Sequence, residues 1–434
     1  MKKILIIIIV SLLPFLTIAS EIKVSGHVVG AEGLQLRVFK YSDQISYQKE
    51  KLLSVNIDEN ANFSFSIDAE QAFYTFLSID LFWSAPLYLE PGNSYYLDID
   101  SADYKMKSTE FFSFLNNKRI YFRVNHDHPK DLNNRIFNFN ASYSEFVIKY
   151  FNTFGASSNN LINEFKEECL SRYVNGEDDE YMTTYITYRI ATLEMSLNLK
   201  SKKTIFTTYI SKQKVHWEND EYMAFFNQFY KKYFQFSSLL NERQIIDAVN
   251  RNCNHVALLD SLGVDSTLRN ERIREMVFIK SLGEVYVPYS DYNPNNVITL
   301  LNSLANTTKF ERHKIAALNM INRITYLKKD SPAPDFTVKD INDSLYTLND
   351  FQNKWLYLGF WTSWSDPSIA EMEAMRKLHK DYKDSINFVM ISVDQEFLDY
   401  YYFIKDNTFP WPVLYYDKNI ELIEAYHTIL IPTG

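Results

Sequence analysis

Hydrophobic and polar residues alternate along residues 21–100 with the period of two that is typical of β-strands. The apolar members of these series include Leu34, Leu36, Val38, Phe63, Phe65, Ile67, Leu97 and Ile99. Turn-forming residues interrupt the alternation at 58–62 and 91–93. The pattern predicts a small antiparallel β-sandwich over residues 21–100.

The hydrophobic period changes to three and four over residues 101–328, which predicts a mainly helical segment. Two such series are Met182, Ile186, Ile190, Leu193 and Leu197, and Ile315, Leu318, Ile321 and Ile324. Aromatic residues are dense over 222–230, where we expect them to pack between helices rather than to stack on a ligand. No internal repeat is evident.

Residues 329–434 have the pattern of an α/β domain. Pro332 and Pro334 form a short extended linker before it, because proline disfavours helix at its own and the preceding position. Apolar strands at 355–360, 386–393 and 413–416 alternate with helical segments, which predicts a largely parallel sheet. The expected fold class is therefore α+β and multidomain, with a β-sandwich, a helical segment and a C-terminal α/β domain.

Composition narrows the possible functions. The chain has 434 residues, of which 46% are hydrophobic and 23% charged, as in ordinary globular proteins. Its net charge is −9 and it has no long basic cluster, which argues against nucleic acid or an anionic membrane as a partner.

Residues 1–20 have the features of a signal peptide. Lys2 and Lys3 precede an apolar run over residues 4–18, and cleavage is expected after Ala19 with Thr17 at the −3 position. The alternative is a membrane anchor, but the run is shorter than the ~20 residues that span a bilayer. No cysteine lies near this segment, so we expect an exported, soluble protein that is not a lipoprotein.

The cysteines and one pair of histidines are further candidates for a functional or disulfide site. Cys169 and Cys253 are the only cysteines, and either one disulfide or two buried thiols would account for them. Neither belongs to a Cys-x-x-Cys pair. His126 and His128 have the spacing of two metal ligands but lack a clear third, so a solvated polar loop is favoured. We expect neither a metal nor a cofactor.

The stretch 359–368 reads Gly-Phe-Trp-Thr-Ser-Trp-Ser-Asp-Pro-Ser, between a predicted strand and a predicted helix. It resembles the active-site turn of the TlpA-like thioredoxin family, in the AhpC/TSA and Redoxin superfamily, Phe-Trp-Ala-x-Trp-Cys-x-Pro-Cys. Trp361, Trp364 and Pro367 are in register, whereas Ser365 and Ser368 occupy the cysteine positions. The resemblance implies a thioredoxin-like domain over 329–434.

Two further phrases carry the resemblance. Residues 333–336, Ala-Pro-Asp-Phe, resemble the entry of TlpA-like and peroxiredoxin-like domains. Residues 89–97, Leu-Glu-Pro-Gly-Asn-Ser-Tyr-Tyr-Leu, resemble the N-terminal domain that precedes TlpA-like modules in exported bacterial proteins. The resemblance thus implies the periplasm or cell envelope of a bacterium as the location.

Serine preserves the shape of such a turn but not its reaction. A hydroxyl does not ionise near neutral pH and forms no disulfide, so dithiol exchange and peroxidatic chemistry are excluded here. Gly359 also replaces the acid that the family places before Phe-Trp. Ser365 is well suited to cap the following helix. As a nucleophile it would need a base, for which His379 and His427 are the candidates, and we favour capping.

The phrase 426–433, Tyr-His-Thr-Ile-Leu-Ile-Pro-Thr, resembles the family's cis-proline segment, which makes Pro432 the candidate cis-proline. The family's next strands and final helix would follow Pro432, so the sequence suggests a truncated domain. The strand at 355–360 would then have an open edge, unless another segment or protomer covers it.

Two functions are consistent with these observations. The first is a binding or structural role without redox chemistry, in which Trp361, Trp364 and Pro432 keep a groove for an extended polypeptide. Simple packing is the alternative explanation of the two tryptophans. The second is a thiol-disulfide oxidoreductase that works through Cys169 or Cys253, or that belongs to the class by descent alone.

Overall fold

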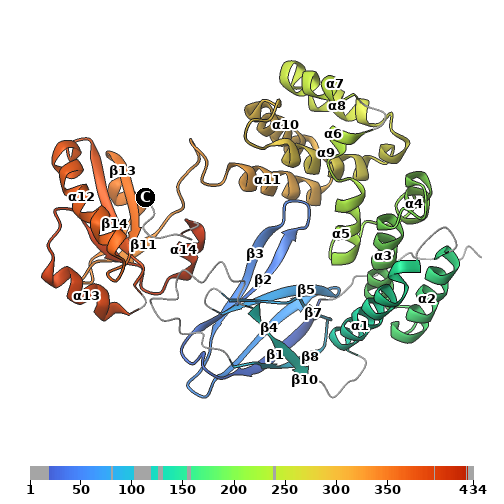
Figure 1. Ribbon diagram of the computed structural model, residues 1–434, viewed down its shortest axis with the longest axis horizontal. Helices are drawn as coiled ribbons and strands as arrows, with labels where there is room; N and C mark the ends of the chain where they lie inside the picture. Colours follow the sequence, from blue (N-terminus) through green and yellow to red (C-terminus); the bar gives the residue numbers. More distant parts are fainter. Residues whose placement is uncertain are drawn as a thin grey trace, which may run out of the picture.

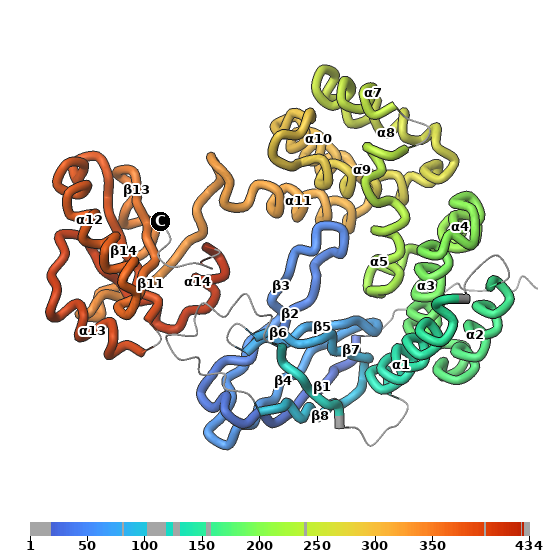
Figure 2. Tube along the Cα trace, in the orientation of Figure 1, coloured from blue at the N-terminus to red at the C-terminus, as the bar shows by residue number. Residues whose placement is uncertain are grey.

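The computed structural model describes residues 19–79, 82–101, 119–125, 131–153, 158–237, 241–394, 396–426 and 428. A β-sandwich, a helical region and an α/β domain follow one another along the chain (Figure 1). The helices arch over the sandwich, and the α/β domain stands to one side (Figure 2). Residues 1–18 of the expected signal peptide lie outside the described residues, and Ser20 is the first residue of β1.

The sandwich packs two sheets around the buried side chains of Ile22, Leu36 and Leu97. Its strands are β1 (Ser20–Val28), β2 (Gln35–Asp43), β3 (Gln48–Asn56), β4 (Asn62–Ala69), β5 (Phe73–Ile79), β6 (Phe82–Ser84), β7 (Leu87–Leu89), β8 (Ser94–Ile99), β9 (Arg119–Ile120) and β10 (Phe122–Asn125). One sheet has the order β10-β8-β1-β4, and the other has the order β3-β2-β5-β6-β9 with β7 beside β5.

The sandwich differs from the expected one in two respects. Its sheets are mixed, because β1 pairs with β8 in parallel and β6 pairs with β9 in parallel. It also extends past residue 100, since β9 and β10 add strands from residues 119–125 and Ile120 enters the core. Both strands are too short for their alternation to reveal them, and their pairing partners lie far away in the sequence.

The buried side chains of the helical region form most of two hydrophobic clusters. Its helices are α1 (Leu132–Tyr150), α2 (Ser158–Tyr173), α3 (Glu180–Ser196), α4 (Lys202–Tyr209), α5 (Asp220–Phe229), α6 (Tyr233–Phe236), α7 (Glu242–Asp247), α8 (His255–Leu262), α9 (Glu271–Val285), α10 (Pro294–Thr307) and α11 (Glu311–Thr325). The aromatic run at 222–230 is buried between helices, which confirms the packing interpretation.

One predicted helix face is partly wrong. Ile324 is buried on α11, but Ile315 and Leu318 are exposed. The buried face instead carries His313, Ala316, Ala317, Met320 and Ile324. This face packs closely against α9: a Cβ atom at Gly283 of α9 would lie 2.2 Å from the Met320 sulfur. On another side, α11 meets the β2–β3 hairpin, where Asn319 donates to Asp43 (2.9 Å) (Figure 1).

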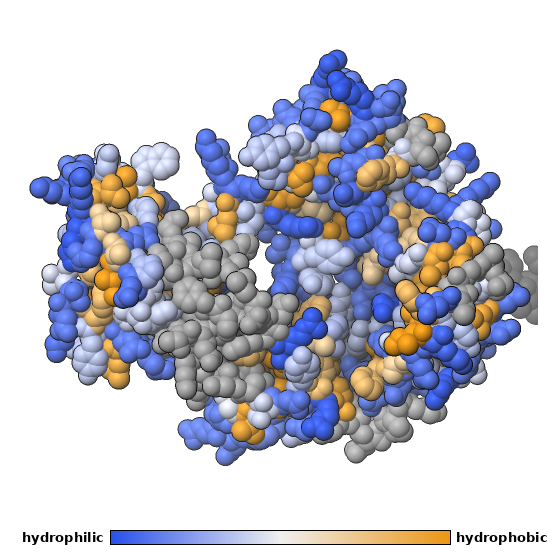
Figure 3. Space-filling view, viewed as in Figure 1, coloured by the Kyte–Doolittle hydropathy of each residue, from blue (hydrophilic) through white to orange (hydrophobic). Residues whose placement is uncertain are grey.

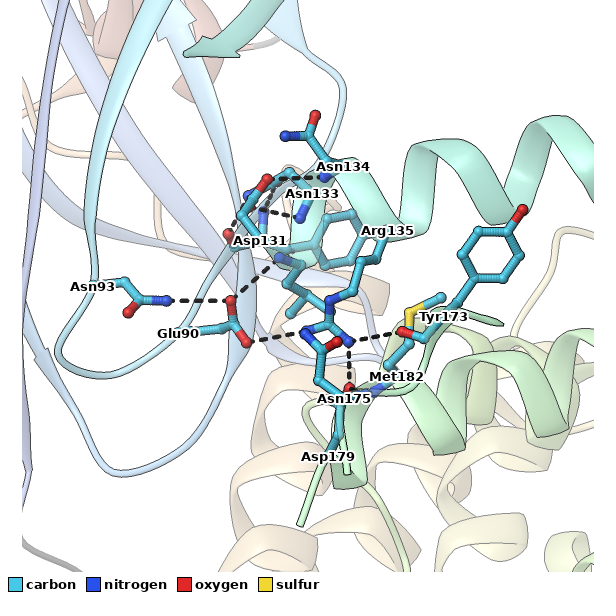
Figure 4. A network of polar contacts seen from close by, with 12 residues as sticks. Glu90, Asn93, Asp131, Asn133, Asn134, Arg135, Tyr173, Asn175, Asp179 and Met182 are labelled. Atoms are coloured by element: carbon cyan, nitrogen blue, oxygen red, sulfur yellow. Dashed lines mark hydrogen bonds and ion pairs between the residues drawn. The ribbon is translucent and has the colours of Figure 1, made fainter. Parts of the chain in front are cut away.

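A polar network around Arg135 ties the sandwich to the first helices (Figure 4). The Arg135 guanidinium donates to the carbonyl oxygen of Tyr173 (3.1 Å), pairs with the Asp179 carboxylate, and lies 3.4 Å from the Glu90 carboxylate. Glu90 belongs to the loop after β7 and also accepts the backbone N–H of Leu132, at the start of α1 (3.2 Å). The arrangement orients α1 on the sandwich, because moving the helix would leave the buried Arg135 charge without its partners, which is strongly destabilising.

A second contact between sandwich and helices contains the buried acid Glu221, on α5. Its neighbour Asp220 accepts hydroxyl hydrogen bonds from Tyr88 (2.8 Å) and Tyr181 (3.2 Å). Glu221 pairs with Arg189 at 3.1 Å. Burial raises the pKa of Glu221 to about 7, although the Arg189 guanidinium opposes the rise.

We expect Glu221 to make stability depend on pH. Because its folded pKa is raised, its favourable contribution is complete below the unfolded pKa near 4.5 and is lost as the pH rises through about 7. The free energy of unfolding should therefore fall by up to about 3 kcal/mol between pH 5 and pH 8. Urea unfolding across this range tests the expectation. Glu221→Gln should flatten the profile and Glu59→Gln, at an exposed site, should not; equal slopes in all three proteins would contradict it.

The C-terminal domain has the predicted alternation of strands and helices. Its elements are β11 (Thr337–Lys339), β12 (Leu345–Thr347), β13 (Trp355–Trp361), α12 (Asp366–Tyr382), β14 (Ile386–Ser392), α13 (Phe397–Asp406), β15 (Val413–Tyr415) and α14 (Ile420–Ala425). The sheet order is β12-β11-β15-β14-β13, with β13, β14 and β15 parallel. Arg37 of β2 reaches this domain through a two-pronged ion pair with Glu424 of α14 (2.8 and 3.2 Å).

The helices of the described residues include none that is long and apolar enough to cross a membrane.

Candidate functional site

The candidate site is the turn between β13 and α12. The backbone N–H of Ser365 donates to the carbonyl oxygen of Thr362 (3.4 Å), and α12 begins at the next residue. The Ser365 hydroxyl accepts the backbone N–H of Ser368 (3.4 Å), which confirms the predicted helix cap. Pro367 lies in the first helical turn, where no backbone N–H is required. The sequence therefore builds a strand, a tight turn and a capped helix.

Asp394 fixes this turn through hydrogen bonds with Ser363. It follows β14, and its buried carboxylate accepts the backbone N–H of Ser363 at both oxygens (3.0 and 3.1 Å) and the Ser363 hydroxyl (2.9 Å). The Ser392 hydroxyl donates to it as well (2.7 Å). Burial raises the pKa of Asp394, while these hydrogen bonds oppose the rise. The sequence pattern did not single out Asp394; its position just after an apolar strand of a parallel sheet was the available signal.

The two serines lie at the N-terminus of α12 and are both buried. Ser365 is 6% exposed, and the hydroxyl of Ser368 is fully buried and has no hydrogen-bond partner within the described residues. Free backbone N–H groups and the helix dipole favour negative charge at this position. A hydroxyl does not ionise there at neutral pH, so the site has the electrostatics of a thiolate site without a thiol.

The histidine near the other end of α12 is not placed to activate Ser365. The two residues are 14 positions apart, which is about 21 Å along a helix. The His379 ring packs against Phe388 and Trp411 instead, with centroids 5.4 Å from each. His427 lies outside the described residues.

The two tryptophans of the turn have different environments. Trp361 is completely buried, with its ring centroid 5.0 Å from that of Phe403 on α13. Trp364 is half-buried and packs against the edge of the domain core. Trp361 is therefore a core residue, and only Trp364 remains available to a groove.

Gly359 has no room for a larger residue. A Cβ atom at this position would lie 2.5 Å from the sulfur of Met390, on the neighbouring strand. An acidic side chain could be accommodated only if Met390 moved. The space in which the resemblance implies a proton-transferring acid is therefore filled by a thioether.

The sheet edge beside the turn is formed by β13. Within the described residues, β13 pairs only with β14. Trp355, at its start, is 82% exposed. Near its other end, the Tyr426 ring packs against Phe360, with centroids 5.4 Å apart. Pro432, the candidate cis-proline, lies outside the described residues.

Neither cysteine lies at the turn. Both are free thiols: Cys169 is buried in α2, and Cys253 follows the π-helical turn Ala248–Asn252. Burial raises the pKa of Cys169 to about 12 and also raises that of Cys253. The expected metal-ligand pair His126 and His128 lies outside the described residues, which themselves contain no group of three potential metal ligands.

A family model described as the AhpC/TSA family matches residues 330–432. Thiol-disulfide oxidoreductase ResA of Oceanobacillus iheyensis is 37% identical over 112 residues, which are 23% of this chain and 55% of the relative. ResA of Bacillus subtilis is 27% identical over 108 residues, which are 25% of this chain and 60% of the relative. The chain thus spans little more than half the length of these relatives.

Two solved structures also have similarity to part of the chain. The thioredoxin domain of thiol-disulfide oxidoreductase BVU-2223 from Bacteroides vulgatus is 24% identical, with a TM-score of 0.23 over 24% of this chain and 78% of that one. StoA from Bacillus subtilis is 28% identical, with a TM-score of 0.21 over 23% of this chain and 77% of that one.

Proposed function

We propose that this chain is an exported binding protein that carries a thioredoxin-like domain, to which the AhpC/TSA family model matches at residues 330–432, and that this domain has lost dithiol exchange. The relatives named thiol-disulfide oxidoreductases support the ancestry of the domain. The features of a signal peptide at residues 1–20 support export to the periplasm or cell envelope.

The observation that carries this proposal is the chemistry of the positions at the start of α12. Hydroxyls stand at Ser365 and Ser368, and both thiols of the chain lie in the helical region. Exchange requires a thiolate, whose pKa such sites lower. The pKa values of Cys169 and Cys253 are instead raised. Neither cysteine has the properties of a replacement nucleophile.

An extended polypeptide is the occupant that best fits the remaining surface. Within the part of the chain that the structure describes, the outer edge of β13 has no paired strand, so its backbone N–H and C=O groups can pair with an added one. Trp364 lies at the carboxyl end of that strand and is half-buried, so part of its ring stays available for contact. Backbone pairing would supply affinity without strict sequence selection.

A thiol-disulfide oxidoreductase is the alternative function, because the ResA relatives are thiol-disulfide oxidoreductases. The specific candidate within this chain is Cys253, which is only partly buried. Its thiol lies 3.8 Å from the carbonyl oxygen of Asn296, with no cation among the groups that shift its pKa.

Insulin reduction in the presence of dithiothreitol distinguishes the two functions. We expect the purified chain to leave the rate at its uncatalysed value, and alkylation of both thiols or the double variant Cys169→Ser/Cys253→Ser to change nothing. Catalysis that disappears in either single cysteine variant would establish the oxidoreductase and overturn our proposal.

Binding of reduced, carboxymethylated insulin B chain tests the polypeptide surface. We expect saturable binding that Trp364→Ala weakens by about tenfold or more, as is usual for an interfacial tryptophan. Phe236→Ala, at an exposed aromatic residue of α6, is the matched control and should bind like the parent chain. Absence of binding, or equal weakening by both variants, would exclude this surface as the site.

A further inference from the structure

A hydrophobic stripe runs along the outer face of α1. It consists of Phe137, Ala141, Ser144, Ile148 and Phe151, the last just beyond the helix end. Phe137, Ile148 and Phe151 are 73%, 78% and 69% exposed. The five residues of the stripe are spaced by four, three, four and three positions, as are the residues along the seam of a coiled coil. Orange side chains come to the surface at the α1–α2 end of the molecule in Figure 3.

This stripe is not required by the fold of the described chain. The opposite face of α1 supplies the core contacts, including the Phe146 ring, which stacks on Phe165 of α2 at 4.0 Å. Asp131 caps the helix by accepting the backbone N–H groups of Asn133 (2.9 Å) and Asn134 (3.0 Å). The buried face and the N-terminal cap therefore hold α1 in place without the stripe. Large apolar residues gathered on the free face of an anchored helix indicate an interaction surface.

We propose that the stripe pairs with the same stripe of a second copy of this chain, with the two α1 helices antiparallel. The order of side-chain sizes along the stripe is the reason for choosing this occupant. A two-fold axis between Ala141 and Ser144 places Ala141 opposite Ser144 of the second copy, and Ser144 opposite its Ala141. The same axis sets Phe137 against the second copy's Ile148, and Ile148 against its Phe137.

Such a pairing is compatible with close packing. Small side chains at the crossing point let two helices approach, and large ones on both sides fill the space as the helices diverge. The Ser144 hydroxyl is satisfied within its own helix, since it donates to the carbonyl oxygen of Asn140 (2.8 Å), so it can be covered without a new partner.

The pairing is also compatible with Glu145, a charged residue beside the seam. Glu145 is the acidic residue next to Ser144, and the antiparallel register brings it toward Asn138 of the second copy rather than toward another carboxylate. An amide can donate to a carboxylate, and like charges are kept apart. The contact is isologous, so it closes at two copies.

The length of the seam predicts a weak dimer. From Phe137 to Ile148 the helix rises about 17 Å. One helix pair of this length buries less than the roughly 1,200 Å² at which standard stable interfaces begin. We therefore expect dissociation in the micromolar range, which corresponds to about −8 kcal/mol.

Sedimentation equilibrium over about 1 to 100 µM of the purified chain tests the pairing. We expect a reversible monomer–dimer transition that Phe137→Asp shifts to at least about tenfold higher concentration. Phe236→Asp is the matched control, because Phe236 is 71% exposed but lies on α6, and it should dimerise like the parent chain. Ile148→Asp provides a second stripe variant if circular dichroism shows that Phe137→Asp has not folded.

Disulfide trapping tests the register. In a Cys253→Ser background, a mixture of Ala141→Cys and Ser144→Cys proteins should cross-link as a heterodimer faster than either protein cross-links with itself. A chain that stays monomeric at every concentration overturns the proposal. So does equal weakening by Phe137→Asp and Phe236→Asp. Faster cross-linking within each single variant overturns the antiparallel register.

Discussion

Replacing Ser365 and Ser368 together with cysteine is expected to convert the chain into an insulin-reducing enzyme, with a rate about 100-fold or more above that of the parent chain. The reason is that the structure already supplies a helix N-terminus and two suitably spaced positions for the thiols. Position 365 caps α12 and faces its free N–H groups, which would lower the pKa of a thiol well below the usual value of about 8.5. Position 368 lies one helical turn further on, within reach for resolving a mixed disulfide.

Controls separate the parts of this prediction. Ser365→Cys alone should form mixed disulfides without turnover, because no resolving thiol follows, and Ser365→Ala/Ser368→Ala should remain inactive. We expect the double cysteine variant to be slower than an ordinary family member, because Met390 fills the space beside Gly359 where an acid would move protons. A folded double variant without activity would mean that the turn does not hold the two positions in a reactive geometry.

Trp361→Ala should be the most destabilising substitution at the turn, with a loss of about 3–5 kcal/mol in the free energy of unfolding of the C-terminal domain. The side chain is completely buried against Phe403, so its removal leaves a cavity that the surrounding sheet and helix cannot fill. A loss of this size is a large part of the 5–15 kcal/mol that typically stabilises a domain. Urea unfolding followed by the remaining tryptophan fluorescence measures it.

Trp364→Ala is the matched control for that prediction. Trp364 is half-buried, so we expect its removal to cost about 1–2 kcal/mol, in proportion to the smaller area that leaves contact. Together the two variants separate a packing role at 361 from a surface role at 364. Equal losses in the two variants would contradict the difference in burial on which this assignment depends.

Features that depend on neighbouring residues could be predicted well. The alternation at 34–38 and 63–67 indicated strands, and the structure has them as β2 and β4. Ser365 and Pro367 indicated the start of α12, because capping involves backbone groups within one turn. The strand–helix–strand order of residues 355–392 was likewise legible from its periodicity.

Features that depend on distant residues were missed or assigned wrongly. The role of Asp394 depends on Ser363, which reaches it only because β13 and β14 are adjacent. His379 packs inward because Trp411 lies beside it. The exposure of Ile315 reflects the packing of α11 against both α9 and a hairpin of the sandwich. None of these contacts leaves a signal in the local pattern.

By itself, the sequence determined that hydroxyl side chains, not thiols, lie at the start of a capped helix. Only the tertiary structure decided that Trp361 belongs to the core, that Trp364 is only half-buried, that Met390 fills the space next to Gly359, and that Phe137 and Ile148 on one face of α1 are exposed. The physical reason is the range of the interactions. Capping and ionisation chemistry depend on residue type and on groups one turn away, whereas burial depends on which distant segments pack together.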